Sequence, residues 1–308
     1  MARADTTGTW RVAMPTLFVL LWSTGFIGAR LGLPHAEPFT FLALRMLIAS
    51  GLLLAVALAT RAPWPGSATQ AAHVAIAGLM VHGGYLGGVF WAIDHGLAAG
   101  VTAIIVSLQP LLTAALAGVV LGERVVARQW LGLMLGFAGV ALVVSSRIDG
   151  GTAAPINLGG AVIALLAITF GTLYQKRFSP GTDLRTGGTI QYVTTGAVLY
   201  TLALAFETRS IEWTGEFVFA LGWLVLVLSV GAIGLLFALI RHGAAAKVAS
   251  LFYLAPPFTA VFGYLLFGET LAPRALVGLA VVMVGVAIVN TAPRTDSVPK
   301  RDVDAADR

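Results

Sequence analysis

Two stretches of the sequence decide the fold. Residues 108–144 read LQPLLTAALAGVVLGERVVARQWLGLMLGFAGVALVV, and residues 254–290 read LAPPFTAVFGYLLFGETLAPRALVGLAVVMVGVAIVN. Aligned at an offset of 146 residues, they share 13 identities without a gap. Matches of Leu, Val and Ala follow easily from apolar composition, but the matched Pro, Arg and Gly-Glu pair do not. The chain is therefore expected to contain an internal repeat.

The composition points to a lipid environment. Of 308 residues, 58% are hydrophobic and only 11% are charged, and the mean hydropathy is +0.89. Soluble globular proteins carry about 25% charged residues, so an ordinary cytosolic enzyme is excluded. The absence of cysteine excludes disulfides and zinc-thiolate sites. The 19 Lys and Arg residues fall singly between apolar runs, so no nucleic-acid partner is expected.

Apolar runs recur along the chain at a length suited to membrane spans. A helix needs about 20 residues to cross a hydrocarbon core of about 30 Å. The sequence predicts an all-α integral membrane protein with ten transmembrane helices, at about 14–33, 39–60, 72–94, 98–121, 127–146, 157–178, 186–207, 216–240, 245–267 and 273–291.

The distribution of Lys and Arg predicts the orientation of these helices. With the N-terminus inside, 14 of the 19 cations fall on the cytoplasmic side, four fall outside, and Arg45 lies within a helix. Cytoplasmic loops carry the excess of positive charge. We therefore expect a cytoplasmic segment at 1–13 and a disordered cytoplasmic tail at 292–308.

The repeat divides the chain into two five-helix halves, residues 14–146 and 157–291, joined by a periplasmic linker at 147–156. Because five is odd, the second half enters the membrane from the opposite side. Such inverted repeats are typical of secondary transporters, whose binding site lies near the midplane between the repeats. The sequence thus predicts two inverted repeats around a central cavity.

The motifs of both halves resemble the EamA-type carriers of the drug/metabolite transporter superfamily. The resemblance is carried by Pro110-Leu-Leu-Thr-Ala, Gly122-Glu123 and Gly139-Val-Ala, by their second copies from Pro256 onward, and by the first two helices with Leu21-Trp22-Ser-Thr-Gly-Phe-Ile and Leu44-Arg45-Met-Leu-Ile-Ala. It covers nearly the whole chain and is similar in general to bacterial exporters of amino acids, including aromatic ones, and of metabolites. It implies ten helices, a central cavity and efflux from the cytoplasm.

The expected function is a secondary transporter that exports amino acids or related small metabolites across the bacterial inner membrane by alternating access. The alternatives are the same fold moving a nucleoside or sugar derivative, and a passive facilitator or channel. No Walker-type phosphate loop occurs, and no enzyme activity or cofactor is expected.

Polar and aromatic side chains within the predicted spans are the candidate ligands for a substrate. A polar group at membrane depth is a functional candidate by default. The predicted substrate-binding residues are Trp22, Thr24, His82, Tyr85, Ser107, Gln109, Phe170, Tyr174, Phe252 and Tyr253. His82 has three interpretations: a substrate contact, a proton-coupling group, or a neutral structural histidine. For the hydroxyls of Thr24 and Ser229, bonding back to the preceding helical turn is at least as good an interpretation.

Prolines and glycines in the spans suggest bends and close packing. Pro110, Pro256 and Pro257 occupy corresponding places in the two halves and are predicted to kink helices and serve as hinges for gating. Gly132 and Gly136 form a small-xxx-small pair, and the glycines at 83, 84, 87 and 88 form two more, so close helix packing is predicted. The Gly-Glu pairs are interpreted as helix ends and turns.

The charged groups limit the choice of substrate. All 14 carboxylates lie at predicted helix ends, in loops or in tails, which argues against a pump for hydrophobic cations and suits a neutral or zwitterionic substrate. Arg45 has two interpretations: contact with a substrate carboxylate, or a structural charge that snorkels outward or pairs with Glu37 or Asp94. The structural interpretation is preferred.

Overall fold

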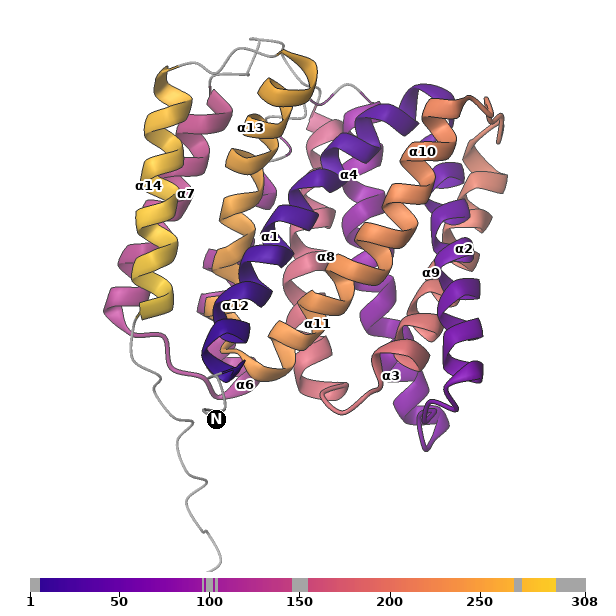
Figure 1. The fold of residues 1–308 in the computed structure, drawn as a ribbon, viewed down its shortest axis with the longest axis horizontal. Coiled ribbons are helices and arrows are strands. Elements are labelled where there is room, and N and C mark those ends of the chain that lie inside the picture. The colour runs from indigo at the N-terminus through magenta and orange to yellow at the C-terminus, as the bar shows by residue number, and fades with distance from the viewer. Residues whose placement is uncertain are drawn as a thin grey trace, which may run out of the picture.

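The computed structural model describes residues 6–95, 97, 102, 105–145, 155–268 and 273–291. These residues form helices and no sheet, and one isolated bridge joins Ala36 to Ile211. The α-helices (Figure 1) are α1 (Thr6–Gly32), α2 (Pro38–Ala59), α3 (Ala68–Gly78), α4 (Tyr85–Asp94), α6 (Gln109–Leu121), α7 (Ala127–Ser145), α8 (Pro155–Phe178), α9 (Leu184–Phe206), α10 (Gly215–Trp223), α11 (Ile233–His242), α12 (Ala245–Ser250), α13 (Ala255–Phe267) and α14 (Pro273–Thr291).

Three of the long helical rods are interrupted by other helical geometries. A first π segment, Leu79–Gly84, joins α3 to α4, and a second π segment, Leu224–Ala232, joins α10 to α11. A 3₁₀ segment, Leu251–Leu254, joins α12 to α13. Single π turns inside α-helices are rare and occur often at functional sites, so the two π segments are candidate positions for such a site.

Eight helical stretches of the described chain are long and apolar enough to cross a membrane. They correspond to eight of the ten predicted spans, whereas Gln109–Leu121 and Ala127–Leu142 are shorter apolar helices. Residues 98–101, 103 and 104 of predicted helix 98–121 lie outside the described residues, as do most of the predicted linker and the whole predicted tail. Helix α1 begins at Thr6, before the predicted span at 14. Its apolar, membrane-spanning stretch begins at Ala13, close to the prediction.

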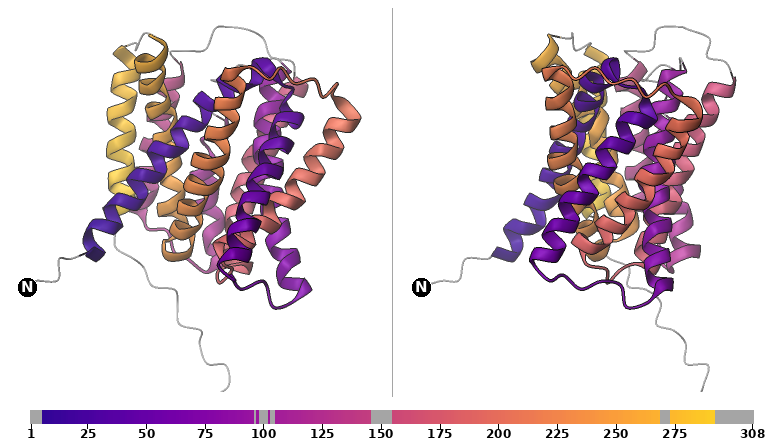
Figure 2. Two further views of the ribbon diagram at one scale, coloured as in Figure 1. Left: turned by 45° about the vertical axis from the view of Figure 1, so that its right-hand side comes forward. Right: turned by 90° about the vertical axis from the view of Figure 1, so that its right-hand side faces the viewer.

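The helices run back and forth between two opposite faces of the bundle. Helix α1 begins and α14 ends at the same face, which is called the terminal face below (Figures 1 and 2). Helices α7 and α14 stand side by side at one end of the bundle, and α2 and α9 pack together at the other. One large cluster of buried apolar side chains runs through the interior. Many large apolar side chains point outward, such as Val119, which is 86% exposed, as expected for contact with lipid.

Glycines set the close contact between α7 and α14. A β-carbon on Gly132 would lie 2.6 Å from the carbonyl oxygen of Gly285, and one on Gly139 would lie 2.8 Å from that of Gly278. Gly88 in α4 approaches Gly160 in α8 equally closely. Small residues let membrane helices approach and gain van der Waals contact. The packing role predicted for Gly132 and Gly88 is therefore what the structure shows.

We expect Gly132→Ala to destabilise the protein, because its new methyl group would overlap the backbone of α14. The expected loss is about 1–3 kcal/mol, the usual cost of overpacking, measured as a lower midpoint of unfolding in detergent. Gly51→Ala is the matched control, since a β-carbon there meets nothing within 4 Å. An equal effect of both substitutions would contradict the packing explanation.

Candidate functional site

A cavity of about 70 Å³ lies in the middle of the bundle. It is bordered by α1, α2, both π segments, α4 and α11. Its polar lining comes from Trp22, Arg45, His82 and Tyr85, and the rest is apolar. The lining continues to Leu33 and Ile93, near the ends of α1 and α4. The cavity therefore extends from mid-bundle toward the face opposite the terminal face.

Arg45 is the charged group of this cavity. It projects from α2, is only 6% exposed, and donates a hydrogen bond from Nε to the hydroxyl oxygen of Ser229 over 3.0 Å. Ser229 belongs to the second π segment, and its carbonyl oxygen accepts a hydrogen bond from the Tyr192 hydroxyl. Arg45 thus ties α2 to a segment 184 residues further along the chain.

The carboxylates named as partners for Arg45 are engaged elsewhere. Glu37 accepts hydrogen bonds from Thr208 and Arg209, and Asp94 lies 3.6 Å from His95. In the described part of the chain, no carboxylate forms an ion pair with Arg45. Neither the pairing nor the snorkelling considered from the sequence is therefore the arrangement found: the guanidinium faces inward.

His82 belongs to a chain of amide hydrogen bonds beside the cavity. It is 1% exposed, and its Nε2 lies 3.2 Å from Oε1 of Gln191. The amide of Gln191 in turn donates to Oε1 of Gln175 over 2.8 Å. Because an amide oxygen only accepts, Nε2 of His82 carries a proton in this arrangement. His82 thus donates to a neighbouring helix, as the structural interpretation requires, while also lining the cavity.

An aromatic cluster of Phe18, Trp22 and Phe252 lies beside the cavity. The ring centroids of Trp22 and Phe252 are 5.2 Å apart, and Phe18 lies within 5.5 Å of both. Trp22 lines the central cavity and Phe252 lines a second, smaller pocket. The cluster therefore separates the two spaces.

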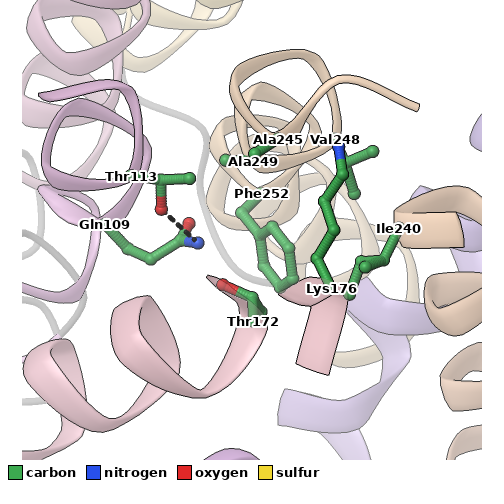
Figure 3. A pocket seen from close by; sticks show the side chains of 9 residues that line it. All are labelled: Gln109, Thr113, Thr172, Lys176, Ile240, Ala245, Val248, Ala249 and Phe252. Carbon is green, nitrogen blue, oxygen red and sulfur yellow. Dashed lines mark hydrogen bonds between the residues drawn. The ribbon is translucent and has the colours of Figure 1, made fainter. Parts of the chain in front are cut away.

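The second pocket encloses about 20 Å³ (Figure 3). Gln109, Thr172, Lys176 and Phe252 are among the side chains that line it. Gln109 donates to the hydroxyl of Thr113 over 3.1 Å, while its own amide oxygen is buried and has no hydrogen-bond partner among the described residues. A buried polar atom without a partner is costly, so this pocket has capacity for one more donor.

An ion pair closes the terminal face beside the second pocket. Lys176 of α8 pairs with Glu123, which follows α6. Glu123 also accepts a hydrogen bond from the backbone N–H of Ala245 over 2.8 Å, at the first residue of α12, and Lys176 also donates to the carbonyl oxygen of Gly243. A carboxylate is favourable at a helix N-terminus. Glu123 therefore links three segments, which is more than the helix-end role inferred from the sequence.

The other predicted ligands lie outside the central cavity. Thr24 bonds back to the carbonyl oxygen of Leu21, as anticipated, and accepts from Trp223. Phe170 is 43% exposed on the outer surface of α8, and Tyr174 is hydrogen-bonded to His73. Tyr253 is buried against Gly136, and Ser107 is buried just before α6. The structure thus brings Trp22, His82 and Tyr85 together with Arg45, and places Gln109 and Phe252 in the second pocket.

The three predicted hinge prolines lie in the first turns of α6 and α13. Pro110 occupies the first turn of α6, and Pro256 and Pro257 occupy the first turn of α13, directly after the 3₁₀ segment. A first-turn proline loses no hydrogen bond, because the N–H groups there have no intrahelical partner. The prolines thus lie where regular α-helical geometry begins, and their predicted role as gating hinges stays a prediction.

Two hydrogen-bond partners at the site, Ser229 and Gln191, are not among the predicted site residues. For the hydroxyl of Ser229, bonding back within its own helix was one of two interpretations, and in the structure its oxygen accepts a hydrogen bond from Arg45. Gln191 was not among the predicted site residues, yet its amide oxygen lies within hydrogen-bond distance of His82. The available signal was their depth in apolar helices, where a polar side chain requires a partner.

Known proteins with similar sequences are transporters. An uncharacterized transporter of Bacillus subtilis is 29% identical over 89% of this chain and 89% of its own. A probable terminal-alkyne amino-acid exporter of Streptantibioticus cattleyicolor is 28% identical over 89% and 91%. A probable amino-acid metabolite efflux pump of Salmonella typhimurium is 23% identical over 88% and 92%.

Structure and family comparisons agree with these sequences. A protein of known crystal structure superposes with a TM-score of 0.74 at 21% identity, covering 90% of this chain and 94% of that one, which shows a shared fold. The model of the EamA-like transporter family matches residues 10–145 and again residues 157–291. With its eight candidate spans, the protein is a multi-pass membrane transporter, and the chain belongs to the EamA-like transporter family.

Proposed function

We propose that this transporter exports amino acids or related small metabolites across the bacterial inner membrane by alternating access. The observation that carries the proposal is the central cavity, which lies between the two halves and is separated from the terminal face by the aromatic cluster and the Glu123–Lys176 pair. A cavity closed on one side at a time is what a carrier requires and an open channel does not.

The proposed architecture is ten spans in two inverted repeats, residues 14–146 and 157–291. In its support, α6 and α13 have bounds that differ by 146 residues at both ends, as do α7 and α14. Gly122 and Gly268 end α6 and α13 with left-handed conformations. Both π segments also occur at matching places.

The glycine contacts give the symmetry further support. At an offset of 146, Gly132 corresponds to Gly278 and Gly139 to Gly285. Gly132 approaches Gly285, and Gly139 approaches Gly278. This reciprocal pattern is the one that a two-fold axis produces, since each residue meets the counterpart of the other. An axis between α7 and α14 would lie in the membrane plane, as inverted repeats require.

We propose that the terminal face is cytoplasmic. The loops and helix ends at this face carry most of the Lys and Arg residues of the described chain, including Arg61, Arg128, Lys176, Arg185 and Arg241. The opposite face carries Arg30, Arg209 and Arg274. Positive charge concentrates on the cytoplasmic side of membrane proteins. The structure then corresponds to a conformation closed toward the cytoplasm.

The substrate class is supported by the cavity and by two relatives. One relative is named a probable amino-acid exporter and another a probable amino-acid metabolite efflux pump. The cavity combines a few polar groups with apolar and aromatic walls, which is the usual composition of small-molecule sites.

We expect counterflow in proteoliposomes that contain the purified protein. Uptake of radiolabelled L-phenylalanine should accelerate when the vesicles are preloaded with the unlabelled amino acid, because a carrier returns faster when loaded. Protein-free vesicles are the control. Equal uptake with and without preloading would support a channel, and uptake competed only by nucleosides would reject the proposed substrate class.

We expect Glu123→Gln to open the terminal face more often, since it removes the charge that pairs with Lys176. The chain has no cysteine, so Ala249→Cys places a single thiol at the second pocket. Its labelling by a membrane-impermeant maleimide added to the cytoplasmic side should become about threefold faster or more. Asp183→Asn is the control: Asp183 pairs with Arg185 at the same face, which lowers the Asp183 pKa to about 2, but contacts neither pocket. Unchanged labelling in Glu123→Gln would reject this closure.

We expect His82→Gln to retain transport with an unchanged pH dependence between about pH 5 and 8, the range in which histidine usually titrates. A glutamine amide can replace the N–H that His82 donates to Gln191. Transport assayed in proteoliposomes across this range, with His73→Gln as the control outside the cavity, tests the structural role. A profile that becomes flat only in His82→Gln would establish proton coupling instead.

A further inference from the structure

The buried guanidinium of Arg45 has N–H donors that make no hydrogen bond to the described residues. Within the described part of the chain, its hydrogen bond is the one from Nε to Ser229. An arginine side chain carries five N–H donors, so the four on the two Nη atoms remain. Arg45 lines the central cavity, and the edge formed by its two Nη atoms is the one that the protein leaves for a ligand.

Electrostatics indicates the charge of that ligand. A cation deep in a membrane protein is costly unless it is paired. No carboxylate of the described residues pairs with Arg45, and the other polar groups of the cavity are Trp22, Tyr85 and His82. An anion that enters the cavity would supply the missing counter-charge.

The geometry of the guanidinium selects among anions. Its planar edge matches the two oxygens of a carboxylate, which it binds through two parallel hydrogen bonds. Ser229 engages Nε, and Tyr192 in turn bonds to the backbone of Ser229. The orientation of the guanidinium is therefore fixed before a ligand arrives.

The apolar and aromatic lining of the cavity indicates the chemistry of the rest of the ligand. Val81, Val89, Phe90, Leu228 and Ile233 supply apolar surface, and the rings of Trp22 and Tyr85 are stacked with centroids 6.5 Å apart. No carboxylate is among the described residues that line the cavity, so an ammonium group finds no ion-pair partner there.

We propose that Arg45 binds the carboxylate of the transported molecule, and that the cavity therefore selects small carboxylates with an apolar body, with no requirement for an ammonium group. This inference rests on the proposed function, because it takes the ligand of the cavity to be the transported molecule. It narrows the proposed substrate class to carboxylates. Because Arg45 belongs to the first half and Ser229 to the second, the ligand binds where the halves meet.

Three probes separate the recognition of the two charged groups. L-phenylalanine has both, 3-phenylpropionate has only the carboxylate, and phenethylamine has only the ammonium. Binding to the purified full-length protein in detergent is measured by the shift in melting temperature and by equilibrium titration. We expect both carboxylates to bind and phenethylamine not to. Binding of phenethylamine in preference to 3-phenylpropionate, or binding of none of the three, overturns the proposal.

Variants identify the residue responsible. Arg45→Gln should weaken binding of 3-phenylpropionate at least about tenfold, the effect of losing a charged hydrogen-bonding partner. Arg185→Gln is the matched control, because Arg185 is a cation of α9 paired with Asp183 outside the cavity. Full affinity in a folded Arg45→Gln protein would overturn the assignment.

A second variant and a comparison of binding with counterflow complete the test. If Arg45→Gln does not fold, Ser229→Ala retains the cation and releases Nε, so it should weaken carboxylate binding severalfold; unchanged affinity would contradict the fixed orientation. Since binding is measured without transport, failure of the two proposals can be told apart. Carboxylate binding without counterflow would reject only the exporter, and counterflow of phenethylamine would reject only the role of Arg45.

Discussion

Hydrocarbon offers no hydrogen bonds, and the rest of this structure depends on that constraint. Helices satisfy the backbone internally, so side chains decide which polar groups meet. This constraint is strongest for Arg45, because its positive charge lies inside the bundle and its hydrogen-bond partner is the uncharged hydroxyl of Ser229. The hydrogen bond to Ser229 holds α2 against the second π segment. Tyr192 of α9 also contacts Ser229, because its hydroxyl donates to the Ser229 carbonyl oxygen. Three distant segments thus meet at the wall of one cavity.

Close packing and polar contacts have different places in the bundle. Glycines bring α7 to α14 and α4 to α8 so closely that a methyl group would overlap the backbone. The cavity lies instead between α1, α2 and the two π segments, where side chains hold the halves together. Contacts made by a few side chains are easier to exchange than a glycine interface. The halves are therefore joined by two kinds of contact, glycine interfaces and hydrogen-bonded or ion-paired side chains.

The internal repeat explains why both faces of the bundle are built from related parts. The helix bounds recur at the offset found in the sequence, but some of the buried polar residues differ between the two copies. Arg45 corresponds to Gln191, and Arg30 corresponds to Lys176. In the structure Arg45 faces the cavity while Gln191 holds His82. Corresponding positions of the two halves thus carry different polar groups.

The sequence by itself determined the helical class, the spans that length and hydropathy identify, the family and the glycine packing, because these follow from composition and from spacing along one helix. It also selected Trp22, His82 and Tyr85 by their depth. Only the tertiary structure decided that Arg45 faces inward to Ser229, that Glu123 joins Lys176 to α12, that Phe170 faces outward, and that the prolines begin helices. The reason is physical: a helical pattern fixes the angular position of a side chain on its own helix, but its partner depends on which face of another helix, far away in the chain, packs against it.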